Sequence, residues 1–388
     1  MKKKILSLVM VLLFVTSVRA VAEESVKQSI RFIYINGSNN NTEKDRRVFY
    51  NGMKKLHPRI KKAFESNSFT KENFLKNDTY SIANDPKVFF WGYDSGSSYV
   101  SMKTSLVSLD FVSPKIAQAV RTLIASVIHD AVWVQKEKNM QKIVNDLHKD
   151  VMFSYNRGEK VVLLGHSAGS FVTYRYLFHK LRVISPESMA AGLEKDENGK
   201  IDPFYRKHPV KSTCLDAITR DKLGVYSMTD GLVRNENEQK LKANYLNLDK
   251  YTDSVCVPDD GVIGVVNYGS PVALFYSDIS VRTPDSSNYN LDILKFLQKN
   301  NMFLITVNFA NDPIGFPLTR NVSAEEYENI YNTKFSPEGK GFVYSKSDFV
   351  SPLNVMGAHN SYWKCPDKFA KAIVKAYSDG YKTFYPDL

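Results

Sequence analysis

The sequence predicts an α/β protein with a mostly parallel central sheet and helices on both of its faces. Two segments, 262–268 and 302–308, are nearly continuous apolar runs, as expected of parallel strands that are covered by helices on both sides. Segments with helical periodicity alternate with such runs along the chain. A third apolar run, 161–164, leads directly into residues 165–169, which read GHSAG. This G-x-S-x-G pattern is typical of a sharp turn from a strand into a helix.

The N-terminal residues predict export. Lysines at positions 2–4 precede an apolar run over 5–15, and the small residues Ala20 and Ala22 follow. This order is typical of a secretory signal peptide cleaved after Ala20 or Ala22. The apolar run is shorter than the roughly 17 residues that a membrane-spanning helix needs. We therefore expect residues 1–22 to be a signal peptide and residues 23–388 to form one domain in the periplasm or outside the cell.

The other elements follow from periodicity and from turn residues. The predicted strands are 29–35, 88–91, 161–164, 262–268 and 302–308. The predicted helices are 42–65, 116–128, 140–151, 171–178 and a C-terminal segment that begins after His359. The amphipathic segment 116–128 fits either a core helix or part of a lipid-facing lid. Residues 185–260 are polar and without strong periodicity, which predicts an insert or lid after the helix that follows Ser167.

The chain is basic, with a formal net charge of +11. Removing residues 1–22 takes away four basic residues and no acid, which leaves 11 − 4 = +7. Such a charge fits either a solvated surface or a peripheral contact with an anionic membrane surface. Lysines do not alternate with aromatic residues in the way that nucleic-acid binding favours, so we expect no nucleic-acid partner.

The cysteines do not form a disulfide framework, because there are only three: Cys214, Cys256 and Cys365. One bridge between Cys214 and Cys256 is compatible with export and would leave Cys365 unpaired. Residues 196–202 resemble part of a calcium loop, but Tyr205 stands where the bidentate glutamate should be, which favours a tight Asn-Gly turn. No clustered His/Cys spacing indicates zinc, and we expect neither a metal nor a cofactor.

Ser167 is the candidate nucleophile. In a strained turn between a strand and a helix, the residues two before and two after the serine must be small, and both are glycine here. The periodic helix before the strand and the breaker-free segment after the serine supply the setting that the motif requires. The alternative is an ordinary Gly-Ser turn between two elements.

The base that activates the serine is expected to be His359. Elbow-type hydrolases place the acid and then the histidine after the serine in the chain, each following a later strand. His179 lies in the helix that the serine opens, and His208 lies in the insert before any later strand. His359 remains, and it lies in a loop ahead of the C-terminal helical segment.

Asp312 is the candidate acid, because it follows the apolar strand 302–308 and would lie at the same sheet edge as the serine. The alternative is that Asn311-Asp312-Pro313 only initiates a turn. Asp348 is the reserve candidate; it is close to His359 in sequence, but only the short apolar run 342–344 precedes it.

Two backbone N–H groups are needed to bind the oxyanion of an acyl-transfer reaction. Ala168, the residue after the nucleophile, supplies one. The other is expected from the turn after the first strand, where the N–H of Ser38 is the first choice and that of Gly37 the second. The alternative is that this turn only ends the strand.

Taken in order, these motifs resemble those of the α/β-hydrolase superfamily, and most closely those of the class 3, or fungal-type, lipases. The likeness rests on segments 35–38 (INGS), 165–169 (GHSAG), 267–272 (NYGSPV) and 311–314 (NDPI), and on His359 with Tyr362-Trp363. The resemblance implies an α/β-hydrolase fold over about 29–365, an oxyanion donor in the residue after Gly37, and a triad of Ser167, Asp312 and His359. Asn36 stands where the family commonly has a basic residue.

The sequence therefore predicts an exported serine hydrolase that cleaves carboxylic esters, in particular lipid esters, through an acyl-enzyme on Ser167. Peptidase, thioesterase and acyltransferase activities share this chemistry and remain open. The rival class is a secreted binding protein that has the fold without the activity.

Overall fold

The computed structural model describes eleven parts of the chain, and the structural statements below refer to them. They are residues 28–38, 42–92, 133–134, 137–180, 261–275, 297–298, 301–318, 321, 323–331, 340–353 and 355–386.

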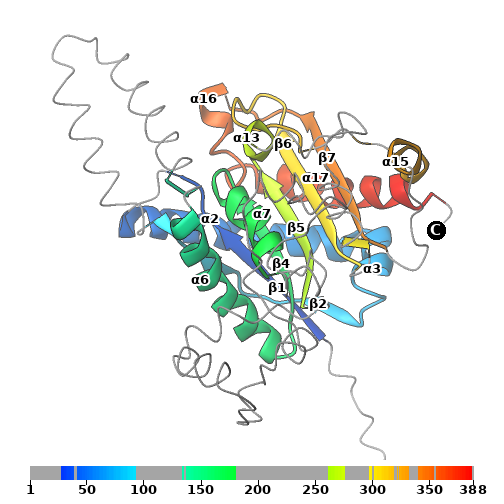
Figure 1. The fold of residues 1–388 in the computed structure, drawn as a ribbon, viewed down its shortest axis with the longest axis horizontal. Helices are drawn as coiled ribbons and strands as arrows, with labels where there is room; N and C mark the ends of the chain where they lie inside the picture. Colours follow the sequence, from blue (N-terminus) through cyan, green and yellow to red (C-terminus); the bar gives the residue numbers. More distant parts are fainter. Residues whose placement is uncertain are drawn as a thin grey trace, which may run out of the picture.

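A parallel sheet forms the centre of the molecule (Figure 1). Its strands are β1 (Gln28–Ile35), β2 (Tyr80–Ile82), β3 (Lys87–Phe89), β4 (Lys160–His166), β5 (Val262–Tyr268), β6 (Phe303–Phe309) and β7 (Phe342–Phe349). The order is β2-β1-β4-β5-β6-β7, and β3 pairs with β1 beyond the end of β2. Every pairing between these strands is parallel, as the nearly continuous apolar runs of β5 and β6 predict.

The register brings the carboxyl ends of the strands to one edge. Ile35 pairs with Gly165, Gly165 with Asn267, Asn267 with Thr306, and Thr306 with Ser345. The residues that follow these five positions therefore leave the sheet on the same side. Loops at that edge are where open α/β sheets bind their ligands.

Two layers of helices cover the sheet (Figure 1). On one face lie α2 (Glu43–Ser66), α3 (Ser68–Asn73) and α17 (Pro366–Phe384), and on the other lie α6 (Glu137–Asn156) and α7 (Gly169–Lys180). The shorter helices are α13 (Val272–Phe275), α15 (Ala324–Tyr331) and α16 (Val355–Ala358). Among the helices that the structure describes, none combines the length and apolar character needed to cross a membrane.

Local signals in the sequence explain why α2 forms where it does. The side chain of Thr42 accepts a hydrogen bond from the backbone N–H of Asp45, and the Asp45 side chain accepts one from that of Thr42. This capping box satisfies two N–H groups that the first turn cannot pair. A buried stripe then follows the helix at intervals of three and four residues: Phe49, Met53, Leu56, Ile60 and Phe64.

The predicted α/β class is confirmed, and most predicted elements agree with the structure. Strand 262–268 matches β5, helix 42–65 matches α2 within one residue, and segments 140–151 and 171–178 lie within α6 and α7. The predicted elements do not include β2 or α3, and the predicted apolar run 342–344 covers only the first three residues of β7.

Several predictions fall outside the described residues. They are the signal peptide 1–22, the helix 116–128, the insert 185–260 with the turn at 196–202 and His208, and the pairing of Cys214 with Cys256. Within the described part of the chain, Cys365 is a free thiol.

Candidate active site

Ser167 lies at the tip of the turn between β4 and α7. Its φ angle is +51°, in the left-handed region that a non-glycine residue seldom adopts. Its N–H donates to the carbonyl of Tyr268 at 3.0 Å, which ties the turn to β5. A Cβ added at Gly169 would lie 2.5 Å from the carbonyl oxygen of Asn36, and one at Gly165 would lie 2.8 Å from that of Gly169. The two glycines thus let the strand, the turn and the helix approach closely, as the motif predicts.

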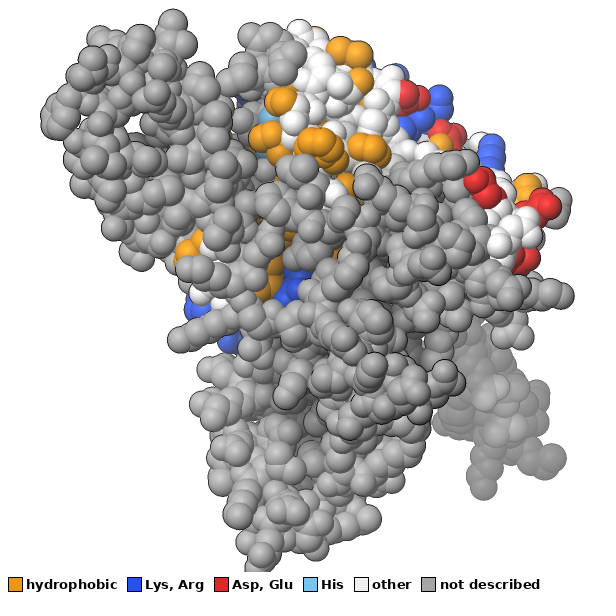
Figure 2. Space-filling model, turned by 45° about the horizontal axis from the view of Figure 1, so that its top comes forward, with side chains coloured by type: hydrophobic (Ala, Val, Ile, Leu, Met, Phe, Trp, Pro, Cys, Tyr) orange, Lys and Arg blue, Asp and Glu red, His pale blue; other side chains and the backbone are white. Residues whose placement is uncertain are grey.

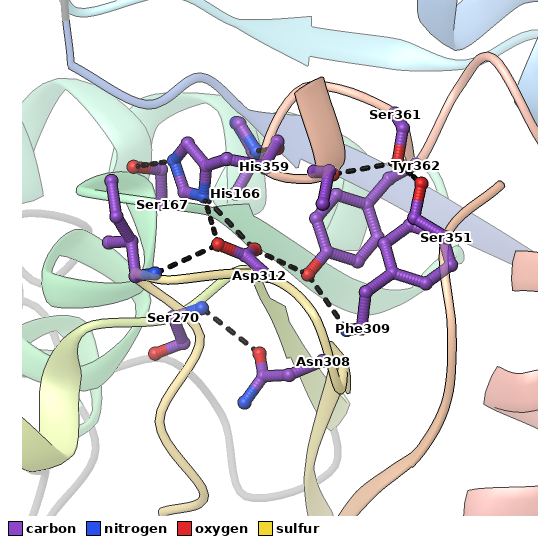
Figure 3. Close-up of polar contacts among 12 residues, drawn as sticks. His166, Ser167, Ser270, Asn308, Phe309, Asp312, Ser351, His359, Ser361 and Tyr362 are labelled. Atoms are coloured by element: carbon purple, nitrogen blue, oxygen red, sulfur yellow. Dashed lines mark hydrogen bonds and ion pairs between the residues drawn. The ribbon is translucent and has the colours of Figure 1, made fainter. Parts of the chain in front are cut away.

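The structure brings Ser167, His359 and Asp312 together (Figure 3). Nε2 of His359 lies 2.8 Å from Oγ of Ser167, and Nδ1 lies 3.0 Å from each carboxylate oxygen of Asp312. The serine follows β4, the aspartate follows β6, and the histidine follows α16, in the loop beyond β7. An imidazole held between a hydroxyl and a carboxylate in this way can take the hydroxyl proton while the carboxylate stabilises the imidazolium.

Asp312 is buried, and its carboxylate is fully hydrogen-bonded. Oδ1 accepts from the backbone N–H of Ile314 at 2.9 Å, and Oδ2 accepts from the hydroxyl of Tyr362 at 2.7 Å. The same hydroxyl accepts from the N–H of Phe309 at 3.1 Å (Figure 3). Burial by itself would raise the pKa of Asp312, but the hydrogen bonds from His359, Tyr362 and Ile314 outweigh it and lower that pKa. The carboxylate is therefore charged at neutral pH, as an orienting acid must be.

Close glycine packing also adjoins the acid. Gly269, which follows β5, has a φ angle of +54°, and a Cβ added there would lie 3.0 Å from Oδ2 of Asp312 and 3.2 Å from Cε1 of His359. The next residue, Ser270, donates its N–H to Oδ1 of Asn308 at 3.1 Å (Figure 3). Segment 267–272, one of those that carry the family resemblance, therefore packs directly against the triad.

A second histidine, His166, lies beneath His359. Its Nε2 is 3.0 Å from the backbone carbonyl of His359, so this nitrogen carries the proton and donates it. Its Nδ1 is buried and has no hydrogen-bond partner among the described residues. Burial and, next, the neighbouring His359 lower the pKa of His166 to about 3. His166 is thus a neutral donor that holds the backbone of the candidate base.

The turn after β1 packs against the serine. A Cβ added at Gly37 would lie 2.6 Å from Cβ of Ser167 and 3.0 Å from the carbonyl oxygen of His166. Ser38 follows directly and is half-buried. On the other side, Ala168 is buried, and its N–H has no hydrogen-bond partner among the described residues. The three predicted oxyanion-hole residues therefore lie in the two segments that flank Ser167.

Asn36 organises that turn, and sequence reasoning did not find its role. Its Nδ2 donates to the carbonyl of Gly37 at 2.8 Å, and its Oδ1 accepts from the N–H of Trp91 at 2.9 Å. The indole N–H of Trp91 donates to the carbonyl of Asn36 at 2.7 Å. The signal available in the sequence was the position of Asn36 directly after an apolar strand.

Asp348, the reserve acid, is not part of the site. Its Oδ2 accepts from Nζ of Lys346 at 2.9 Å, and its side chain is 62% exposed. The reserve interpretation is therefore wrong: β7 continues to Phe349, and within it Asp348 pairs with a lysine of its own strand. His179 lies in α7, and its side chain is outside what the structure describes.

No group of three or more His, Cys, Asp or Glu residues within the described part of the chain is arranged to hold a metal ion. The chain matches no protein-family model, no curated protein and no solved structure. The geometry of the site is therefore what bears on function.

Proposed function

We propose that the protein is an exported serine hydrolase with the α/β-hydrolase fold, resembling class 3 lipases, and that it cleaves carboxylic esters. The single observation that carries this proposal is the hydrogen-bonded series Ser167–His359–Asp312 on a strained turn. A histidine paired with an aspartate can also belong to a network that has no catalytic role, so the pair alone does not indicate catalysis. A serine in the left-handed region, aimed at a histidine that an aspartate orients, is the arrangement that nucleophilic catalysis requires.

The positions of these atoms support the following reaction. Oγ of Ser167 attacks the ester carbonyl carbon while Nε2 of His359 accepts the hydroxyl proton, and Asp312 stabilises the resulting imidazolium. The N–H of Ala168 and that of Ser38 or Gly37 are the candidate donors to the tetrahedral oxyanion. When the intermediate collapses, the imidazolium gives its proton to the departing alkoxide, which leaves as the alcohol.

The second half regenerates the serine. Water attacks the acyl carbon as Nε2 of His359 takes one of its protons, and the proton then passes to Oγ of Ser167 as the carboxylic acid leaves. These steps need no electron transfer and no group beyond the three side chains, the oxyanion donors and water.

An apolar rim beside the site favours esters with hydrocarbon chains. Pro313 and Pro317 are exposed, and Val350 and Leu353 are 52% and 36% exposed. Figure 2, which brings the carboxyl edge of the sheet forward, shows hydrophobic side chains gathered there. Apolar surface next to a nucleophile can take up an acyl chain. We therefore propose lipid esters as the substrate class.

A fluorophosphonate probe tests the nucleophile directly. We expect it to label the purified protein at Ser167, with the site located by mass spectrometry, and not to label Ser167→Ala. The same variant should lose ester hydrolysis by on the order of a million-fold and keep its circular dichroism spectrum, because only a hydroxyl is removed. Activity of the variant within about tenfold of the wild type would refute the proposal. Absence of labelling in the wild type would favour the non-catalytic binding protein.

An ester panel tests the substrate class. A series of p-nitrophenyl esters of increasing chain length, with triacylglycerol and phospholipid emulsions, should show kcat/KM rising with chain length. A preference for thioesters, for peptides or for an alcohol acceptor over water would assign the same triad to one of the other acyl-transfer activities.

A further inference from the structure

A groove of about 600 Å³ runs between α2 and α17, on the face of the sheet opposite α6 and α7. No residue of the candidate active site lines it. Its floor includes Ala63 and Ala370 and, one turn further along α17, Val374. Small side chains at these positions keep the two helices from filling the space between them, so the floor is apolar and hollow.

Four cations stand around this floor. Arg59 and Lys62 come from α2, and Lys371 and Lys375 come from α17. The only carboxylate lining the groove is that of Asp367, which leaves 4 − 1 = +3. All four cationic side chains belong to exposed residues, so the charges stand at the rim while the floor stays apolar.

Carboxylates compensate these cations only in part within the described part of the chain: Asp367 lies beside Arg59, and the charge of Lys375 helps to lower the pKa of Asp348. Nη1 of Arg59 lies 3.5 Å from Oδ1 of Asp367. None of Lys62, Lys371 and Lys375 has a carboxylate within 4 Å among the described residues. Lys371 and Lys375 are also four apart on one helix, a spacing at which like charges repel. The groove therefore combines a positive rim with an apolar floor.

We propose that this groove binds an amphiphile with a phosphate headgroup, its phosphate among the four cations and its hydrocarbon chain on the apolar floor. Lysine ammonium groups bind phosphate as point charges, and arginine binds it through paired N–H donors. The hydroxyl of Ser66 lines the same groove and can donate to a phosphate oxygen, whereas that of Ser378 already donates to the carbonyl of Val374 at 3.0 Å. A free phosphate ion would use the rim alone, whereas an amphiphile uses both parts. This site is separate from the proposed catalytic function and does not depend on it.

Two triple variants with equal charge change test the rim. The groove variant is Lys62→Gln/Lys371→Gln/Lys375→Gln. The control variant is Lys44→Gln/Lys55→Gln/Lys364→Gln, whose lysines are exposed and do not line the groove. The probe is dodecyl phosphate below its critical micelle concentration, titrated by calorimetry into the purified protein. Each lysine near an anionic headgroup contributes roughly fivefold in affinity, so the groove variant should bind on the order of 100-fold more weakly. The control variant should change by less than about threefold.

Two further arms test the floor. Inorganic phosphate should bind the wild type much more weakly than dodecyl phosphate does, since only the amphiphile covers the floor. Ala63→Phe fills the floor and should weaken dodecyl phosphate binding while leaving inorganic phosphate binding unchanged. Fluorophosphonate labelling of Ser167 should be the same in all variants, which separates this site from the catalytic one.

Three results would overturn the proposal. Equal weakening in the groove and control variants would show that a general basic surface attracts the anion. Equal affinity for dodecyl phosphate and inorganic phosphate would show that the floor takes no chain. Unchanged dodecyl phosphate binding in folded Ala63→Phe would also show that the floor takes no chain. This single variant still tests the proposal if the triple variant loses its fold.

Discussion

Replacing His166 by glutamine should make the protein less sensitive to acid. His166 is 3% exposed, its Nε2 donates to the carbonyl of His359, and its pKa is lowered to about 3 by burial and by the neighbouring imidazole. Glutamine keeps an uncharged N–H donor near the same place but has no proton to gain. The substitution therefore removes the titratable imidazole and keeps a hydrogen-bond donor.

The sign and size of the effect follow from the two pKa values. An unfolded histidine has a pKa of about 6.5, so between pH 6.5 and pH 3 the unfolded chain binds a proton that folded His166 does not. The stability that His166 contributes is complete above pH 6.5 and is lost as the pH falls. Between pH 7 and pH 4.5 the loss amounts to about 2.5 kcal/mol, which the glutamine variant does not suffer.

Urea unfolding, followed by tryptophan fluorescence at pH 7 and pH 4.5, measures this difference. The free energy of unfolding of the wild type should fall by about 2.5 kcal/mol more than that of His166→Gln. Titratable groups that do not interact with His166 are the same in both proteins, so their contributions cancel in the comparison. Ser167→Ala changes the same site without changing a titrating group and should behave like the wild type. If the free energy of unfolding falls by the same amount in both proteins, to within about 0.5 kcal/mol, His166 is not a neutral, buried side chain.

Four other substitutions, one of them a control, test the site. Asp312→Asn should lower kcat on a soluble ester by roughly 10⁴, because the imidazole is left in the wrong tautomer, whereas Asp348→Asn should be nearly neutral; the opposite ranking would return the acid to Asp348. Tyr362→Phe should lower the free energy of unfolding, measured in urea, by about 2–4 kcal/mol, because Asp312 loses a donor and the buried N–H of Phe309 loses its acceptor. A loss below about 0.5 kcal/mol would contradict the hydrogen bonds assigned to the Tyr362 hydroxyl. Gly37→Ala must displace Ser167 or the turn, because the new Cβ would lie 2.6 Å from Cβ of Ser167; kcat/KM should fall by about 100-fold, and full activity would place the turn farther from the nucleophile.

The parts of the fold that the sequence predicts well are those with strong periodicity or a strict local geometry. The strand at 262–268 is a nearly continuous apolar run with turn residues at both ends, so its limits agree with β5. The turn at Ser167 could be located because two glycines have to stand at fixed places around it. His359 and Asp312 followed by elimination, from chain order and from the strands that precede them.

The parts that sequence reasoning missed depend on contacts between distant segments. β2 has three residues and pairs only with the start of β1, so no local pattern distinguishes it from a loop. Beyond its first three residues, β7 has serine, lysine or aspartate at four of five positions, and its pairing with β6 makes it a strand. Tyr362 is separated by 50 residues from the carboxylate to which it donates. Its hydroxyl offers no signal in the sequence that names its partner.

The strand order explains why the imidazole has to lie over the carboxyl end of β5. Ser167 follows β4 and Asp312 follows β6, so one strand, β5, separates them. Neighbouring strands lie about 4.8 Å apart, which leaves roughly 10 Å between the two strand ends, too far for a direct contact between hydroxyl and carboxylate. An imidazole can bridge this gap only by crossing over the end of β5. A side chain at Gly269 would occupy that path, since its Cβ would lie 3.0 Å from Oδ2 of Asp312 and 3.2 Å from Cε1 of His359. The glycine after β5 is therefore as much a requirement of the triad as the glycines around Ser167.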